Sequence, residues 1–293
     1  MSTFLLILIT GIGLGALYFL VASGLSLIYG LMGVINFAHG AFLTIGAFTA
    51  LWISTKVFPN PTTWTFLVAM ITGGIVAGLF ALLMEQLVIN RLYNRHIDQA
   101  LVTVGVALVV TALFSGWFGN DARFFPTPLW FMNAVTIGDA IIPIDRFIYI
   151  GVAAISLIAI LSILKFTRIG LIIRAGVENR SMVTALGINV RLAFSTVFFI
   201  GGFAAGIGGV LISVFSYGVS PLMGGSWLIY GFIVVVVGGM GSITGSAIAA
   251  MLIGITNQFA NYYLTGLGDF AIVIVLAVVL LTKPSGLLGK VAH

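Results

Sequence analysis

The first 55 residues of the chain contain no Lys, Arg, Asp or Glu. A helix that spans a lipid bilayer needs about 20 apolar residues, so this stretch alone has room for two such helices. It is too long, and too bare of charge at its start, for a cleavable signal peptide. Only 6% of all 293 residues are charged, whereas soluble domains carry roughly 25%. Lipid must therefore be the main solvent of this protein.

Apolar segments, separated by charges and turn residues, divide the chain into successive spans. They are 4–30, 31–53, 64–90, 99–118, 146–165, 192–215, 226–262 and 268–282. Segment 226–262 is too long for one pass, yet its first arm, 226–238, rises only about 20 Å at the helical rise per residue. The hydrocarbon core is roughly 30 Å thick. We therefore predict an all-α polytopic membrane protein, one transmembrane domain over 1–293, with about eight or more membrane helices.

Two glycine-rich runs resemble each other and indicate breaks inside the membrane. The run GLMGVI at 30–35 is similar to GGMGSI at 238–243, and further glycines follow each run. Transporters often duplicate discontinuous helices around a central pathway; alternatively, the glycines only permit close helix packing. We expect discontinuous or re-entrant segments near 30–40 and 238–245. The glycines expected to break the helices are Gly30, Gly33, Gly40, Gly238, Gly239, Gly241 and Gly245.

The distribution of basic residues predicts the orientation of the chain. The connectors 91–98 and 165–191 and the C-terminal tail hold nine of the twelve Lys and Arg residues, and the other three are Lys56, Arg123 and Arg146. Because cytoplasmic loops carry the excess of Lys and Arg, we expect these two connectors and the tail to face the cytoplasm.

Polar side chains near the two breaks are candidates for the solute pathway. Polar groups inside a bilayer are costly unless they are paired or wet. They either line a pathway or cap helix ends and satisfy freed backbone groups, and the sequence leaves both interpretations open. The candidate pathway residues are Asn36, Phe37, His39, Ser242 and Thr244.

A short amphipathic helix is predicted at 178–186, within the longest polar region of the chain. Its apolar residues recur at helical spacing, and a glycine at 187 provides a stop. Such a helix either lies on the lipid headgroups with its basic residues on anionic lipid or docks a cytoplasmic subunit. The residues predicted to couple the chain to such a subunit are Arg174, Glu178, Arg180, Met182, Ala185, Leu186 and Gly187.

Several kinds of chemistry find no support in the sequence. Cysteine is absent, three histidines are scattered without metal-ligand spacing, and no P-loop, nucleophile elbow or HExxH motif occurs. Glu85 lies near the end of its segment and Asp269 begins the last one, so no acid is expected deep in a span for proton coupling. We therefore expect no enzyme, no metal site, no cofactor in this chain and no nucleic-acid partner.

Four stretches carry a resemblance to a known family. They are GLSLIYGLMGVINFAHG at 24–40, the segment 170–189 with its core RAGVENRSMVTALGIN, VGGMGSITG at 237–245 and KPSGLLG at 283–289. Together they resemble LivH-type permeases, the membrane subunits of ABC importers for branched-chain amino acids. The likeness covers nearly the whole chain. Two positions depart from it: Ala41 stands where an acidic residue is common, and Tyr230-Gly231-Phe232 stands where Lys-Ala-Phe is common.

The resemblance implies a permease subunit that forms part of the pathway for branched-chain or related amino acids. It implies a second related permease, two cytoplasmic subunits that bind ATP, and an extracytoplasmic solute-binding protein. It also implies a bacterial or archaeal cytoplasmic (inner) membrane, and it places the coupling segment at 174–189. The alternatives are a permease for urea, short amides or aromatic acids from the same superfamily, and a self-sufficient secondary carrier or channel.

Overall fold

The computed structural model describes residues 2–33, 36–92, 95–178, 180–187 and 190–289. Almost all regular structure is helical, with one two-stranded antiparallel hairpin. The elements are α1 (Ser2–Met32), α2 (His39–Trp52), α3 (Thr63–Leu87), α4 (His96–Phe118), β1 (Ala134–Ile137), β2 (Ala140–Pro143), α5 (Ile144–Phe166), α6 (Arg168–Glu178), α7 (Arg180–Ala185), α8 (Val190–Phe215), α9 (Met223–Gly238), α10 (Ile243–Tyr263) and α11 (Gly268–Thr282).

Seven helices in the described part of the chain are long and apolar enough to cross a membrane. They are α1, α2 with its π-helical extension Ile53–Val57, α3, α4, α5, α8 and α10, while α9 and α11 are shorter apolar helices. The prediction of an all-α polytopic membrane protein is confirmed. Segment 226–262 divides, as expected, into α9 and α10 around a turn at 239–242. The sixteen residues of α9 rise about 24 Å, too little to cross the hydrocarbon core alone.

Three local expectations need correction. The second helix begins at His39 rather than at residue 31, because the chain leaves the helical conformation at Gly33. The connector 119–145, which lies between the predicted spans 99–118 and 146–165 and was assigned no regular structure, contains the β1–β2 hairpin. The region around 178–186 forms two helices, α6 and the six-residue α7, where one was expected.

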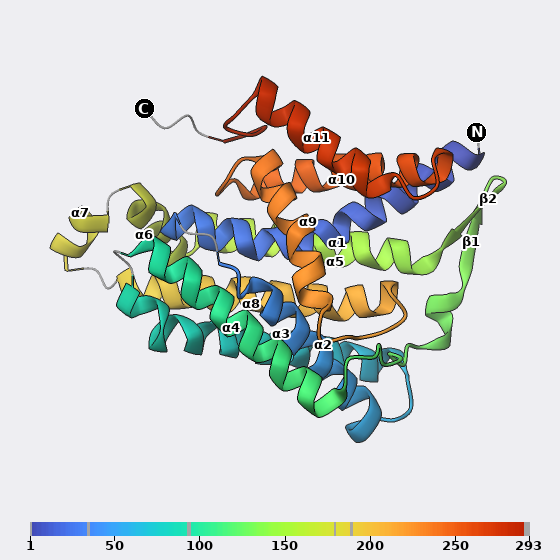
Figure 1. Cartoon of the computed structure of the whole chain (residues 1–293), viewed down its shortest axis with the longest axis horizontal. Coiled ribbons are helices and arrows are strands. Elements are labelled where there is room, and N and C mark those ends of the chain that lie inside the picture. Colours follow the sequence, from blue (N-terminus) through green and yellow to red (C-terminus); the bar gives the residue numbers. More distant parts are fainter. Residues whose placement is uncertain (1, 34–35, 93–94, 179, 188–189, 290–293) are drawn as a thin grey trace.

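The long helices lie side by side along the longest axis of the molecule (Figure 1). At one end lie α6, α7 and the C-terminal tail; we call this the basic end because segment 165–191 is the most basic connector. At the other, which we call the hairpin end, lie β1, β2 and the start of α1. The short helix α9 crosses the bundle obliquely, between the neighbourhood of α2 and that of α10 (Figure 1).

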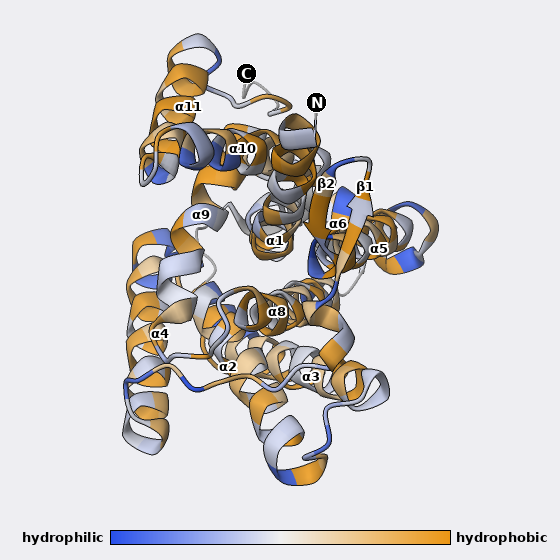
Figure 2. Cartoon of the chain, turned by 90° about the vertical axis from the view of Figure 1, so that its right-hand side faces the viewer, coloured by the Kyte–Doolittle hydropathy of each residue, from blue (hydrophilic) through white to orange (hydrophobic). Residues whose placement is uncertain are grey.

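Burial separates three central helices from two peripheral ones. The most apolar windows of α1 and α2 are each 67% buried and that of α8 is 83% buried, whereas those of α4 and α5 are 11% and 17% buried. Figure 2 shows α4 and α5 at the periphery with largely hydrophobic outer surfaces. Because lipid tails are as apolar as these side chains, α4 and α5 are suited to face lipid, while α1, α2 and α8 form the core.

Small residues allow the central helices to pack closely. A Cβ atom added to Gly15 of α1 would lie 2.6 Å from the Ala250 carbonyl oxygen of α10, and one added to Gly206 of α8 would lie 2.7 Å from the Ala77 Cβ of α3. Within lipid, helices associate through such close backbone approach rather than through a hydrophobic driving force. Close packing therefore explains many of the glycines.

The side chain of Glu85 is enclosed by the bundle. Glu85 lies near the end of α3, as its sequence position indicated, but it is only 1% exposed. Ser195 of α8 donates a hydrogen bond to its Oε2 at 2.5 Å. A buried carboxylate needs such donors because an unpaired charge in a low-dielectric interior is expensive. The Glu85–Ser195 contact thus joins α3 to α8.

Candidate functional site

The two glycine-rich breaks lie against each other. A Cβ atom added to Gly30 would lie 3.1 Å from the Cα of Gly241, and one added to Gly241 would lie 2.8 Å from the Cα of Gly30. Gly33, Gly239 and Gly241 have positive φ angles of 66°, 100° and 83°, which L side chains rarely adopt. The remaining predicted break glycines end or begin helices and pack closely. The structure therefore joins two sequence runs that are some two hundred residues apart.

The first break is held by hydrogen bonds to its own backbone and to two other helices. The Oδ1 of Asn36 accepts a hydrogen bond from the Ala38 amide at 3.0 Å, which is a turn-forming role typical of Asn. The Phe37 amide donates to the Thr103 hydroxyl of α4 at 3.2 Å. The Nε2 of His39, which is fully buried, lies 2.9 Å from the Val21 carbonyl oxygen of α1.

These contacts favour the structural interpretation of Asn36 and His39. Both side chains are buried, and each has a nitrogen without a hydrogen-bond partner among the described residues, Nδ2 of Asn36 and Nδ1 of His39. Phe37 is the more accessible of the three, and its ring lies 5.3 Å from that of Phe232 on α9. Their place in a solute pathway stays a prediction.

The second break is capped by its own serine. The Ser242 hydroxyl accepts a hydrogen bond from the Gly245 amide at 3.1 Å and so caps the first turn of α10. The Thr244 hydroxyl lies 3.5 Å from the Ser242 hydroxyl and is exposed. Thr244 is therefore the better placed of the two to meet a solute.

The C-terminal loop packs on this second break, a contact that the sequence did not indicate. The Leu287 amide donates to the Val237 carbonyl at 2.8 Å, and the Leu288 amide donates to the Gly238 carbonyl at 3.0 Å. These carbonyls belong to the last turn of α9, where the helix itself supplies no donor. The KPSGLLG stretch thus completes the end of α9.

A small apolar depression lies on the face shared by α1 and α9, beside the breaks. Its lining is apolar or aromatic, and the Tyr29 hydroxyl is its one polar side-chain group. It is formed by Leu25 and Tyr29 of α1 with Phe232, Val235, Val236 and Met240 of α9 and its turn. Side chains of this kind suit an apolar solute or an apolar partner surface.

The residues predicted to couple the chain to another subunit lie on α6 and in the α7 region, at the basic end (Figure 1). Met182 and Leu186 of the α7 region are 62% and 69% exposed, whereas Val183 is buried. Ala185 and Gly187 are exposed, and Arg174 on α6 is exposed as well. The side chains of Glu178 and Arg180 lie outside the described residues. The segment thus presents apolar side chains outward at this end.

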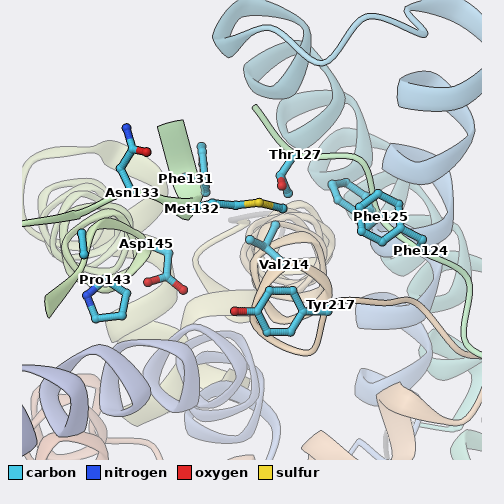
Figure 3. A pocket seen from close by; sticks show the side chains of 11 residues that line it. Phe124, Phe125, Thr127, Phe131, Met132, Asn133, Pro143, Asp145, Val214 and Tyr217 are labelled. Atoms are coloured by element: carbon cyan, nitrogen blue, oxygen red, sulfur yellow. The ribbon is translucent and has the colours of Figure 1, made fainter. Parts of the chain in front are cut away.

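A cavity of about 270 Å³ lies under the hairpin, at the opposite end (Figure 3). Phe125, Phe131, Tyr217 and Asp145 are among its lining residues. Tyr217 is the one described non-glycine residue with a positive φ angle, 53°, a conformation that costs free energy. The carboxylate of Asp145 accepts a hydrogen bond from Tyr149 at 3.0 Å.

The charge of this carboxylate is balanced within the chain. The Nε atom of Arg146 lies 3.7 Å from Oδ1 of Asp145, and the guanidinium group lies 4.6 Å from the ring centroid of Phe215. No group of three or more His, Cys, Asp or Glu residues in the described part of the chain could hold a metal ion. The cavity therefore offers no unbalanced charge to a ligand.

Comparison with known proteins identifies the family. Residues 7–282 match the family described as the permease component of branched-chain amino acid transport systems. The chain belongs to this family. It is 29% identical to the high-affinity branched-chain amino acid transport system permease protein LivH of Escherichia coli K12, over 98% of this chain and 96% of LivH.

Two other relatives show the range of the likeness. The chain is 27% identical to the permease protein BraD of Pseudomonas aeruginosa, over 97% of this chain and 95% of BraD. It is 26% identical to the galactofuranose transporter permease protein YtfT of Escherichia coli K12, over 80% of this chain and 64% of YtfT. The chain is thus a transport permease with several membrane-length helices, and the resemblance to LivH-type permeases is confirmed.

Proposed function

We propose that this chain is the permease subunit of an ABC importer that carries branched-chain or related amino acids across a bacterial or archaeal cytoplasmic membrane. A second, related permease would complete the pathway, and an extracytoplasmic binding protein would deliver the solute. Two cytoplasmic subunits would bind ATP, so this chain would need no cofactor and would catalyse no reaction itself. The names of LivH and BraD and the full-length match to their family support the substrate class.

The observation that carries the proposal is the outward apolar edge of α7 at the basic end. Met182 and Leu186 are both largely exposed there. The positive-inside rule assigns the basic end to the cytoplasm, where partner subunits that bind ATP would dock. An exposed apolar edge on a connector is suited to a reversible contact with such a subunit.

The apolar depression between α1 and α9 supports an amino acid with an apolar side chain. The depression is shallow, about 10 Å³, and its six lining residues are apolar or aromatic, so contact with them would favourably remove part of an aliphatic side chain from water. Among these side chains only the Tyr29 hydroxyl could hydrogen-bond urea or a short amide. The mainly apolar lining therefore supports a branched-chain amino acid over these more polar solutes.

The test replaces Met182 of α7 and Leu186, which directly follows α7, by acids, Met182→Asp with Leu186→Asp. We expect the variant to insert normally and to keep the second permease, but to lose both co-purification with the ATP-binding subunits and ATP-driven uptake of labelled leucine. The matched control is Leu171→Asp on α6, since Leu171 is 62% exposed and lies outside the predicted coupling segment.

Normal uptake by the double variant would contradict the proposal. So would ion-gradient-driven leucine flux by the purified chain alone in liposomes, because that result would establish a self-sufficient carrier. Uptake of urea or an aromatic acid in place of leucine would retain the importer and reject the substrate class.

A further inference from the structure

Polar side chains from three helices meet at one carboxylate, that of Asp269 in the first turn of α11. The Tyr230 hydroxyl of α9 donates to its Oδ1 at 3.0 Å, and Nδ2 of Asn257 on α10 lies 3.4 Å from the same oxygen. Asn261 in turn donates to Asn257 at 3.1 Å. Asp269 itself is exposed. The sequence did not single out Tyr230 or Asp269 as site residues.

The position of Tyr230 is fixed by neighbouring aromatic rings. The Tyr230 ring stacks on Tyr18 of α1 at a centroid distance of 5.1 Å, and Trp227 lies 5.9 Å away. Trp227 packs edge-on against Phe215 of α8 at 5.8 Å. Because these rings come from three helices, the phenol group of Tyr230 is held toward α11. Tyr230 is therefore a positioning residue for the carboxylate of Asp269.

The chain contains a second Tyr–Asp pair, which shows what the first one lacks. Asp145 also accepts a hydrogen bond from a tyrosine, Tyr149, but Arg146 lies 3.7 Å from its other oxygen. No Lys, Arg or His among the described residues lies within 4.0 Å of Asp269. The two pairs thus share a phenol donor and differ in the counter-charge.

An unbalanced carboxylate beside membrane-spanning helices is costly unless a cation or water meets it. The amino end of α11 offsets only part of this cost, because the helix dipole is equivalent to roughly half an elementary charge. The hydrogen bonds from Tyr230 and from Asn257 both go to Oδ1 of Asp269. The Oδ2 atom has no hydrogen-bond partner among the described residues, so it is open to a donor from outside the chain.

We propose that Asp269 receives the protonated amino group of the transported solute. An alkylammonium group carries three N–H donors and a positive charge, which match an exposed carboxylate. The aromatic rings of Trp227 and Tyr230 beside it suit the aliphatic part of the solute. The choice of an amino acid as solute rests on the proposed function; recognition of an amine by Asp269 does not.

The test measures equilibrium binding of labelled leucine to the complete importer complex in nanodiscs, without the solute-binding protein. We expect Asp269→Asn to weaken leucine binding about tenfold or more, since it removes a charge-assisted hydrogen bond and keeps the side-chain volume. The matched control, Asp145→Asn, should leave leucine affinity unchanged. In competition, isopentylamine should displace leucine and 4-methylpentanoate should not, because only the former has an amino group.

A double-mutant cycle tests the positioning role of Tyr230. Tyr230→Phe should weaken leucine binding in the wild-type background and have no further effect in the Asp269→Asn background, because the phenol acts through the carboxylate. Equal losses in both backgrounds would show that Tyr230 only supports the local fold.

Three results would overturn the inference. They are equal leucine affinities for Asp269→Asn and Asp145→Asn, displacement of leucine by 4-methylpentanoate as effectively as by isopentylamine, and loss of the second permease from the Asp269→Asn complex with leucine affinity retained. The last result would assign the missing cation to the partner subunit. If isopentylamine binds and leucine does not, the inference about Asp269 stands and the proposed substrate class fails. If neither binds while energised leucine uptake persists, the inference about Asp269 fails and the proposed substrate class stands.

Discussion

The energetic effect of the contact between the two glycine-rich breaks can be separated from backbone strain. This is done by comparing two glycines whose φ angles both lie in the left-handed region. Gly241 has a φ angle of 83°, and a Cβ atom added to it would lie 2.8 Å from the Cα of Gly30. Gly33 has a φ angle of 66°, and no described atom lies within 4 Å of its added Cβ. An alanine in the left-handed region costs about 1–2 kcal/mol at either position. Only Gly241→Ala also forces two backbones apart, which adds about 1–3 kcal/mol of overpacking.

We therefore expect Gly241→Ala to lower the free energy of unfolding by about 2–5 kcal/mol and Gly33→Ala by about 1–2 kcal/mol. The assay is reversible unfolding of the purified chain by SDS titration in mixed micelles, followed by tryptophan fluorescence. Leucine uptake by the assembled importer should fall in the same order. If the two alanine variants unfold at the same SDS fraction, the breaks do not support each other and the reasoning from their contact is wrong.

Three further predictions concern hydrogen bonds of the described residues. Ser195→Ala should lower the free energy of unfolding by about 1–3 kcal/mol in the same titration, because Glu85 loses a hydrogen-bond donor. A loss below about 0.5 kcal/mol, the level of an ordinary surface substitution, would show that this donor contributes little to stability. His39→Phe should destabilise the chain by about 0.5–1.5 kcal/mol through loss of the hydrogen bond to Val21. It should leave the order of preferred solutes in a competition assay unchanged. A changed order would place His39 in the pathway. Deletion of residues 284–293 should reduce stability and uptake, because two carbonyls at the end of α9 lose their donors; wild-type unfolding of the truncated chain would contradict this.

Most membrane helices could be predicted because hydropathy is a local property of the sequence. The division of 226–262 into two helices followed from the same reasoning, since length and glycine content both point to a break. The start of α2 could not be placed in this way, because hydropathy continues through 31–38 while the backbone turns at Gly33 and resumes the helix at His39. Apolar composition does not distinguish a helix from an irregular segment buried among helices.

Two missed elements did leave a signal in the sequence. Gly138 and Asp139 separate two short runs rich in β-branched residues, and a Gly-Asp pair in this position is typical of a tight hairpin. The structure pairs Ile137 with Ala140 across that turn. Ile169, Ile172 and Ile173 have helical spacing, which indicates a helix before the predicted 178–186 helix, at the position of α6. Both patterns are short. They were missed because charged residues lie beside them and because the connector 119–145 is long.

The contacts of the candidate site could not be predicted because they join residues far apart in the sequence. The Phe37–Thr103 contact joins the first break to α4, and the Tyr230–Asp269 contact joins α9 to α11. Hydropathy and periodicity say which residues are apolar and which share a helix face, but they carry no information on which helices are neighbours. The candidate pathway residues chosen near the breaks therefore omitted Asp269, whose partners come from α9 and α10.

The helix α1 connects the basic end with both candidate features of the pathway. It contacts α6, which precedes the proposed docking helix α7. Gly30, in the last turn of α1, touches the turn after α9, and Tyr18, near the middle of α1, stacks on Tyr230 in the middle of α9. Coupling between distant sites is carried by chains of packed side chains and rigid helices. A displacement of α6 on docking would therefore move α1 against the middle of α9 and against the turn that follows it. The glycine-rich turn and the phenol of Tyr230 would shift together, because a helix as short and oblique as α9 can follow such a movement without breaking a full membrane span.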